Sequence, residues 1–282
     1  MKLKMKSSRL LSLIISLFGL AAVWSQTLEQ TEQVADKFME QGDYYSAAKF
    51  YSRVYFFADK SQLGRINGKL GMAYFGKGDF KRAYNHFDVA QKLESDDSTK
   101  TEWFLRKTSA LILRHQYKLA LLGILNYRGK FTSRQQKNLI FLKGTVYFAE
   151  EKYDEAKKTF VQIIDPGDSL ALARLDSLFT KKNLMRPNPV TAKWLSIFIP
   201  GLGQIYAGDI KNGINSFALN ATLFYLFARD AVRFSFTESF FVFYPWIQRY
   251  YQGGYERAQR IAKKKRRQKR AQVYHGVHEI LM

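Results

Sequence analysis

Residues 78–87 read Gly-Asp-Phe-Lys-Arg-Ala-Tyr-Asn-His-Phe, and residues 42–51 follow the same plan as Gly-Asp-Tyr-Tyr-Ser-Ala-Ala-Lys-Phe-Tyr. In both, a Gly-Asp turn precedes an aromatic residue, then an alanine and a second aromatic residue on one face of a helix. Residues 115–124 and 151–160 repeat the plan with more substitutions. The first aromatic residue recurs every 36 or 37 residues, which predicts a stack of helical hairpins.

The segments upstream of these turns also match one another. Residues 70–74 read Leu-Gly-Met-Ala-Tyr, residues 144–147 read Gly-Thr-Val-Tyr, and residues 35–38 match them more weakly. The combined pattern resembles the tetratricopeptide repeat (TPR), in which a small residue lets paired helices approach and an aromatic residue fills the space between repeats. The residues that carry this resemblance are Gly42, Tyr44, Ala47, Tyr51, Leu70, Gly71, Tyr74, Gly78, Phe80, Ala83, Phe87, Tyr117, Ala120, Gly144, Tyr147, Tyr153, Ala156 and Phe160.

The resemblance implies an all-α fold in which residues 26–182 form four TPR-like repeats and a capping helix, expected at 168–182. The third repeat departs from the pattern, because Thr108 stands in place of a glycine and Ile124 in place of an aromatic residue. The resemblance also implies a groove that binds a helix or an extended peptide of a protein partner.

Residues 1–25 have the pattern of a secretory signal peptide: a basic start, an apolar run at 10–23 and the small residue Ser25, after which we expect cleavage. The apolar run is shorter than the roughly 20 residues that a spanning helix needs. An uncleaved anchor helix is the alternative, because Trp24 is unusual beside a cleavage site. In either case the segment that follows is predicted to be exported.

Three apolar stretches lie in the last third of the chain. Residues 183–193 form a polar hinge with two prolines, and the stretches follow at 194–206, 214–228 and 234–247. Each is short for a hydrocarbon core about 30 Å thick. We nevertheless predict a small α-helical membrane domain over 194–250. Three crossings are favoured over a two-helix hairpin, because three place the basic C-terminal tail in the cytoplasm.

Residues 200–208 read Pro-Gly-Leu-Gly-Gln-Ile-Tyr-Ala-Gly. This segment resembles the PGLGQ signature of short-hairpin membrane modules that accompany TPRs in uncharacterised envelope proteins of the Bacteroidetes type. The resemblance implies a location in the bacterial inner membrane with the TPR domain in the periplasm, and it assigns no chemistry. Asn220 is expected to form hydrogen bonds between helices of the module. The residues of this membrane motif are Pro200, Gly201, Gly203, Gln204, Tyr206, Gly208 and Asn220.

Positive charge concentrates at the C-terminal end. The formal net charge is +21, and residues 181–282 contribute 17 basic against 5 acidic residues. In the tail, residues 251–282, the run 263–270 reads Lys-Lys-Lys-Arg-Arg-Gln-Lys-Arg. We expect this tail to hold the membrane orientation and to bind anionic lipid. Nucleic acid is the less favoured partner, because the neighbouring aromatic residues lie at the predicted membrane border.

No catalytic, cofactor-binding or metal-binding set is visible in the sequence. The absence of cysteine excludes disulfides and a cysteine nucleophile. His86 and His115 fall within the repeats, and His275 with His278 lacks a third metal ligand. We therefore predict a protein that is not an enzyme and has no cofactor: a membrane-anchored envelope scaffold whose exported TPR domain binds a protein partner. The alternative is a pore or lipid-handling membrane component that the TPR domain regulates.

Overall fold

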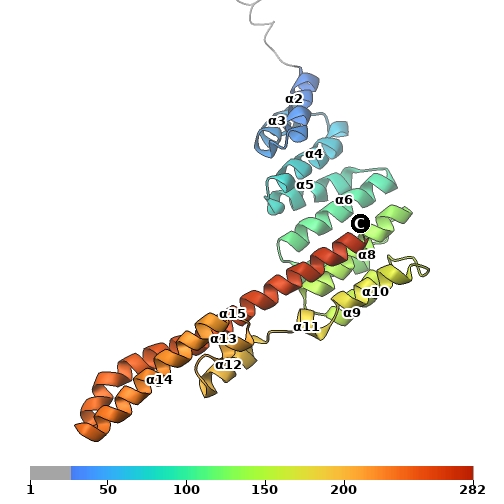
Figure 1. Ribbon diagram of the computed structural model, residues 1–282. Helices are drawn as coiled ribbons and strands as arrows, with labels where there is room; N and C mark the ends of the chain where they lie inside the picture. Colours follow the sequence, from blue (N-terminus) through green and yellow to red (C-terminus); the bar gives the residue numbers. More distant parts are fainter. Residues whose placement is uncertain (1–26, 282) are drawn as a thin grey trace, which may run out of the picture. The chain divides into compact units, whose positions relative to one another are not determined.

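The computed structural model describes residues 27–281, and every regular element within them is helical (Figure 1). The predicted all-α fold is therefore confirmed. The predicted signal segment 1–25 lies outside the described residues. Contacts divide the chain into two compact units, of which the N-terminal unit ends at Thr159 and the C-terminal unit begins at Phe160.

Helices that follow one another in the N-terminal unit pack side by side, as α2 does on α3, α4 on α5 and α6 on α7. Successive pairs also touch, through α3 and α4, α5 and α6, and α7 and α8, so the unit is a stack of hairpins (Figure 1). The elements are α2 (Leu28–Glu40), α3 (Tyr44–Phe57), η1 (Lys60–Gln62), α4 (Leu63–Gly76), α5 (Phe80–Leu93), α6 (Asp97–Leu113), α7 (Tyr117–Asn126) and α8 (Ser133–Ala149), followed by α9 (Tyr153–Val161) at the division.

Four turns between successive helices share one hydrogen-bond pattern. In the first, the amide of Gly42 donates to the carbonyl of Met39 at 3.1 Å, and the amide of Asp43 donates to that of Phe38 at 2.9 Å. Both bonds recur in the other three turns, and together they form a Schellman motif. The left-handed residues of these turns are Gly42 (φ 75°), Gly78 (φ 82°), His115 (φ 59°) and Glu151 (φ 62°).

The aspartate of each Gly-Asp pair begins the next helix. A side-chain oxygen of Asp43 accepts the amide hydrogen of Ser46 at 3.0 Å, and Asp79 accepts that of Arg82 at 3.1 Å. Such N-caps satisfy one of the amide groups that the first helical turn leaves without a partner. The dipeptide therefore ends one helix and starts the next.

The C-terminal unit is organised around α15, a helix of 46 residues with Pro245 inside it. Its contacts run along α14, α13 and α12 and continue to α11 and α10 (Figure 1). Ala258 and Ala262 are fully buried against Ala192 and Ala207. The elements are α10 (Ser169–Leu178), α11 (Lys181–Leu184), α12 (Pro189–Phe198), α13 (Leu202–Tyr206), α14 (Ile210–Arg233) and α15 (Phe236–Leu281).

These elements differ from the predicted segments in three places. The expected capping helix 168–182 is broken after Leu178, and the expected hinge 183–193 is partly helical, because α12 begins at Pro189. The third apolar stretch and the basic tail 251–282 belong to one continuous helix. Val273 and Val277 near its end are buried, so the tail is a packed part of the unit.

The membrane domain predicted over 194–250 is not supported. Within residues 27–281, no helix combines the length and the apolar character that a membrane crossing requires. The helix α14 has 24 residues, but Asn212, Asn220, Arg229 and Asp230 interrupt its apolar sequence.

Candidate functional site

Most of the TPR-signature residues are buried. Ala47, Ala83, Ala120 and Ala156 are completely buried. Close packing explains the small residues, since a Cβ added to Gly71 would lie 2.5 Å from the ring of Phe87. Tyr51, Leu70, Gly71, Phe87, Gly144, Tyr153 and Phe160 are also buried, Tyr44, Tyr74, Phe80, Tyr117 and Tyr147 are half-buried, and Gly42 and Gly78 are exposed in their turns.

The glycines of the membrane motif allow close contacts between short helices of the C-terminal unit. Gly201, with φ 92°, precedes α13, and a Cβ there would lie 2.1 Å from the carbonyl oxygen of Gly213. A Cβ on Gly203 would lie 1.9 Å from the carbonyl oxygen of Ala192. Gly208, with φ 78°, ends α13 in another Schellman turn. Pro200 is half-buried in the bend between α12 and α13.

The polar residues of the motif hold these helices together. Gln204 is 1 % exposed; its Oε1 accepts the hydroxyl of Ser196 at 2.9 Å, and its Nε2 donates to the carbonyl of Gly254 at 3.1 Å. The hydroxyl oxygen of Tyr206 accepts the amide hydrogen of Asn188 at 3.1 Å. The motif thus forms the joint between α12, α13 and α15.

A cavity of about 440 Å³ lies between α14 and α15. Arginines from α15 and asparagines from α14 line it, and no carboxylate is among the described residues of its wall. The six residues that define this arginine cavity are Arg249, Arg257, Arg260, Asn212, Asn215 and Asn220.

The positive charge of this cavity is only partly compensated. Arg257 donates to Oδ1 of Asn212 at 3.1 Å, and Asn212 in turn donates to Asp209, which holds the pKa of that carboxyl below its ordinary value. Arg260 lies 3.5 Å from Glu256. Within residues 27–281, Arg249 has no ion pair or hydrogen bond. The cavity is therefore suited to an anion.

Asn220, which lines the cavity, has one buried side-chain atom without a hydrogen-bond partner in the described part of the chain. Asn220 is 1 % exposed, and its Nδ2 donates to the carbonyl of Ser216 in the same helix at 2.7 Å, so the hydrogen bond expected between helices is not formed within residues 27–281. Its Oδ1 is buried without a hydrogen bond among the described residues. A buried acceptor in this state costs about 1–3 kcal/mol.

The same two helices carry many large apolar side chains that are exposed. The most exposed of them are Val232 and Phe241, at 89 % and 73 %. A surface of this kind marks a membrane or protein contact in soluble domains. We define the apolar hairpin surface as Ile214, Phe217, Leu219, Tyr225, Val232, Phe236, Phe241, Val242, Trp246 and Tyr250.

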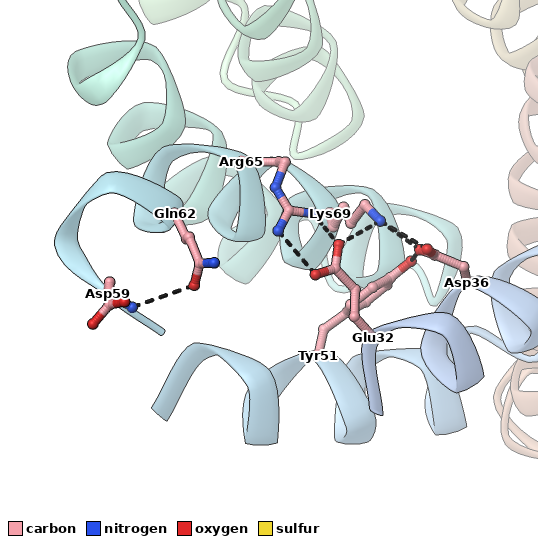
Figure 2. A network of polar contacts seen from close by, with 7 residues as sticks. All are labelled: Glu32, Asp36, Tyr51, Asp59, Gln62, Arg65 and Lys69. Atoms are coloured by element: carbon pink, nitrogen blue, oxygen red, sulfur yellow. Dashed lines mark hydrogen bonds and ion pairs between the residues drawn. The ribbon is translucent and has the colours of Figure 1, made fainter. Parts of the chain in front are cut away.

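The N-terminal unit contains a network of charges that joins α2, α3 and α4 (Figure 2). Glu32 on α2 pairs with Arg65 and with Lys69 on α4, the latter at 2.7 Å. Lys69 also contacts Asp36 at 2.7 Å, and the hydroxyl of Tyr51 donates to Asp36 at 2.5 Å. Every member therefore has a partner inside the network, as expected of a structural tie between the first two hairpins.

The network shifts the pKa values of its members. Burial raises the pKa of Glu32, but hydrogen bonds and charges from Arg65 and Lys69 outweigh it and hold this pKa below 4.5. Burial and the neighbouring Asp36 raise the pKa of the Tyr51 hydroxyl. Glu32 is thus kept charged and Tyr51 neutral near pH 7.

The histidines occupy separate environments. His86 hydrogen-bonds Asn67 at 2.9 Å, and burial followed by the charge of Arg82 lowers its pKa. His275 lies 3.3 Å from Glu279 on the exposed side of α15. No group of three or more metal-ligating side chains is found in the part of the chain that the structure describes.

Comparison with known protein families, curated proteins and solved structures finds no match for this chain. The TPR and PGLGQ resemblances therefore remain predictions from the sequence. The sequence analysis pointed to Gln204 and Asn220 but not to Arg249, Arg257 and Arg260. Their spacing on one helix opposite the asparagines of α14 is the signal that would have found the cavity.

Proposed function

We propose that the protein is a membrane-attached scaffold without catalytic activity. The N-terminal unit is the scaffold that binds a protein partner, and the C-terminal unit attaches it to lipid. The apolar hairpin surface carries this proposal, because it exposes aromatic and aliphatic side chains along both α14 and α15. The basic residues farther along α15 support it, since they attract anionic headgroups at about 1 kcal/mol each.

The mode of attachment that we propose is interfacial. The hairpin lies in the boundary between headgroups and acyl chains, with its apolar side chains toward the acyl chains. This arrangement needs no crossing helix. The proposed location is the bacterial inner membrane with the N-terminal unit in the periplasm, and it rests on the export signal predicted from residues 1–25.

Flotation of the full chain with lipid vesicles tests the attachment. We expect the protein to float with vesicles that contain phosphatidylglycerol, and we expect the double variant Val232→Glu, Phe241→Glu to remain at the bottom of the gradient. The matched control is Phe56→Glu, Phe57→Glu, which places the same charges at side chains 80 % and 72 % exposed in the N-terminal unit. Equal flotation of both variants would contradict the proposal.

The depth of insertion is measured with Trp246, which is 50 % exposed on the hairpin. In a variant that keeps Trp246 as its single tryptophan, bromine atoms high on the acyl chains should quench its fluorescence more than bromine atoms near the bilayer centre. The reverse order would contradict interfacial attachment.

The proposed protein partner binds the N-terminal unit. Phe56 and Phe57 at the end of α3, and Leu119 and Leu122 on α7, are exposed apolar side chains that a helix or an extended peptide would cover. Photocrosslinking from Phe57 and from Leu122 in the intact native envelope should capture the same protein. Capture of unrelated proteins, or of none, would count against a scaffold role.

A further inference from the structure

We propose that the arginine cavity binds a phosphate ester that carries a neighbouring hydroxyl group, as in a phosphoglycerol group. Two sources share this chemistry: the headgroup of phosphatidylglycerol and free glycerol phosphate. The cavity itself is inferred independently of membrane attachment, whereas the lipid as its source rests on the proposed function. The argument has three steps, which concern charge, space and the unpaired acceptor.

The charge of the cavity selects an anion. Three guanidinium groups line it without a carboxylate among the described residues of the wall. Arg249 has no ion pair or hydrogen bond in the described part of the chain, and the bond of Arg257 goes to the neutral amide of Asn212. Guanidinium groups bind phosphate through two parallel hydrogen bonds, so both side chains are available for one phosphate.

The space for the phosphate lies over Gly253. Arg249, Gly253 and Arg257 follow one another at intervals of four residues, so they share one face of α15. A Cβ added to Gly253 would meet nothing within 4 Å. The missing side chain therefore leaves an opening between two arginines on the wall of the cavity.

The unpaired acceptor selects the hydroxyl. Asn220 lines the cavity, and its buried Oδ1 has no donor among the described residues. A phosphate diester has no hydrogen to donate, but the hydroxyl groups of a glycerol ester do. One ligand that brings both groups satisfies the arginines and Asn220 together.

A lipid source also fits the surroundings of the cavity. Leu219 and Tyr250 line it and belong at the same time to the apolar hairpin surface. A headgroup in the cavity would therefore lie beside side chains that contact acyl chains. These apolar side chains at the cavity favour a lipid over a nucleic acid, which presents no apolar chain.

Calorimetric titration of the full chain with glycerol phosphate, and separately with inorganic phosphate, tests the site. We expect glycerol phosphate to bind more tightly than inorganic phosphate, and Arg249→Gln with Arg257→Gln to weaken its binding by at least about tenfold. Asn220→Leu should remove the preference for the ester while phosphate still binds. Gly253→Leu should block both ligands without loss of any charge.

The matched control removes two positive charges elsewhere in the same unit. Lys182 and Lys269 line another basic cavity, of about 570 Å³, so Lys182→Gln with Lys269→Gln changes the net charge equally. We expect this variant to bind glycerol phosphate as the original protein does. An equal loss in both double variants would overturn the proposal, because net charge alone would then explain binding.

Vesicle flotation separates the two sources and separates this inference from the proposed function. If the arginine variant loses its preference for phosphatidylglycerol over phosphatidylcholine vesicles, the site and the lipid source are supported. If it keeps that preference but loses glycerol phosphate, the site is supported with the free ester as its source. If the protein floats with vesicles but calorimetry detects no binding of glycerol phosphate, the site is overturned and membrane attachment still stands. Tighter binding of a short RNA, lost in the same variant, would also overturn the proposal.

Discussion

Gly42 and Gly123 both have room for a methyl group, but their backbones differ. A Cβ on Gly42 would meet nothing within 4 Å, and a Cβ on Gly123 would lie 3.9 Å from the ring of Phe104. Gly42 has φ 75°, whereas Gly123 lies inside α7. Conformation, and not space, therefore decides what an alanine does at each position.

We predict opposite changes in stability at these two glycines. Gly42→Ala should lower the free energy of unfolding by about 1–2 kcal/mol, because a Cβ disfavours the left-handed conformation. Gly123→Ala should raise it by about 0.5–1 kcal/mol, because alanine loses less entropy in a helix. Urea unfolding followed by circular dichroism measures both changes. An unchanged or higher stability of Gly42→Ala would show that the turn is not held in this conformation.

Ala83 tests the packing of the TPR signature. Its side chain is completely buried in α5, so Ala83→Leu should cost about 1–3 kcal/mol by overpacking. Lys81→Leu, at an exposed position of the same helix, is the control and should change stability by about 0.5 kcal/mol or less. Thermal unfolding of the full chain compares the two variants. Equal melting temperatures would mean that Ala83 is not at a tight helix contact.

Single residues also show where sequence reasoning was sufficient. The spacing of Ala47, Ala83, Ala120 and Ala156 identified positions that are all fully buried. The substitution of glycine by Thr108 could not be interpreted from the pattern alone. In the structure Thr108 is 1 % exposed, and its hydroxyl donates to the carbonyl of Phe104 at 2.8 Å, which satisfies the polar group inside the helix pair.

At the scale of elements, the pairing of α2 with α4 depends on ionised Glu32. Because its pKa in the folded chain is below 4.5, it stabilises the fold above that pH. We predict that this contribution is lost as the pH falls from about 4.5 through the lowered pKa. Glu32→Gln should lower the free energy of unfolding by about 1 kcal/mol at pH 7. It should also weaken the fall of this free energy with decreasing pH below about 4.5.

The control for this prediction is Glu40→Gln, which removes a carboxylate at an exposed position of the same helix. It should leave the pH dependence of unfolding near that of the original chain. Urea unfolding between pH 3 and pH 7 measures both variants. If Glu32→Gln leaves the pH dependence of unfolding unchanged, the network does not stabilise the contact between α2 and α4.

The second half of α15 is held by a small apolar stripe. Val273 and Val277 are buried, and a Cβ on Gly276 would lie 2.9 Å from the side chain of Leu178 on α10. We predict that Val273→Asp with Val277→Asp detaches this end of the helix. Trypsin cleavage within 263–270 should then become about several-fold faster, because the detached segment opens more often. Gln272→Asp, at an exposed position, should leave cleavage unchanged. Similar cleavage rates in both would contradict the packing of α15 on α10.

The continuity of α15 was not predicted, for a physical reason. The change from the apolar stretch 234–247 to the basic tail 251–282 suggested a boundary, and Gly253-Gly254 lies close to it. Gly254 is instead a contact point, because its carbonyl accepts the side chain of Gln204 at 3.1 Å. The spacing of four between Ala258 and Ala262, and again between Val273 and Val277, was the available signal for a continuing helix.

At the scale of the whole molecule, the distribution of charge predicts a dependence on salt. Residues 181–282 carry 17 basic and 5 acidic residues. Binding to vesicles that contain phosphatidylglycerol should therefore weaken between 0.1 M and 1 M salt, where the screening length falls from about 10 to 3 Å. Binding to phosphatidylcholine vesicles should change little, because it depends on the apolar hairpin surface. Flotation at both salt concentrations measures the difference. An equal response of both kinds of vesicle would exclude an electrostatic contribution to vesicle binding.

The length of α15 has a mechanical consequence. A helix of 46 residues extends for about 69 Å, and in this unit it has no loop along the way. Its first half carries part of the apolar hairpin surface, and its second half packs on α10 and α11. A load applied to the hairpin is thus passed along a single rod to the opposite end of the unit. Pro245 removes one backbone hydrogen bond of that rod and is the place where it bends first.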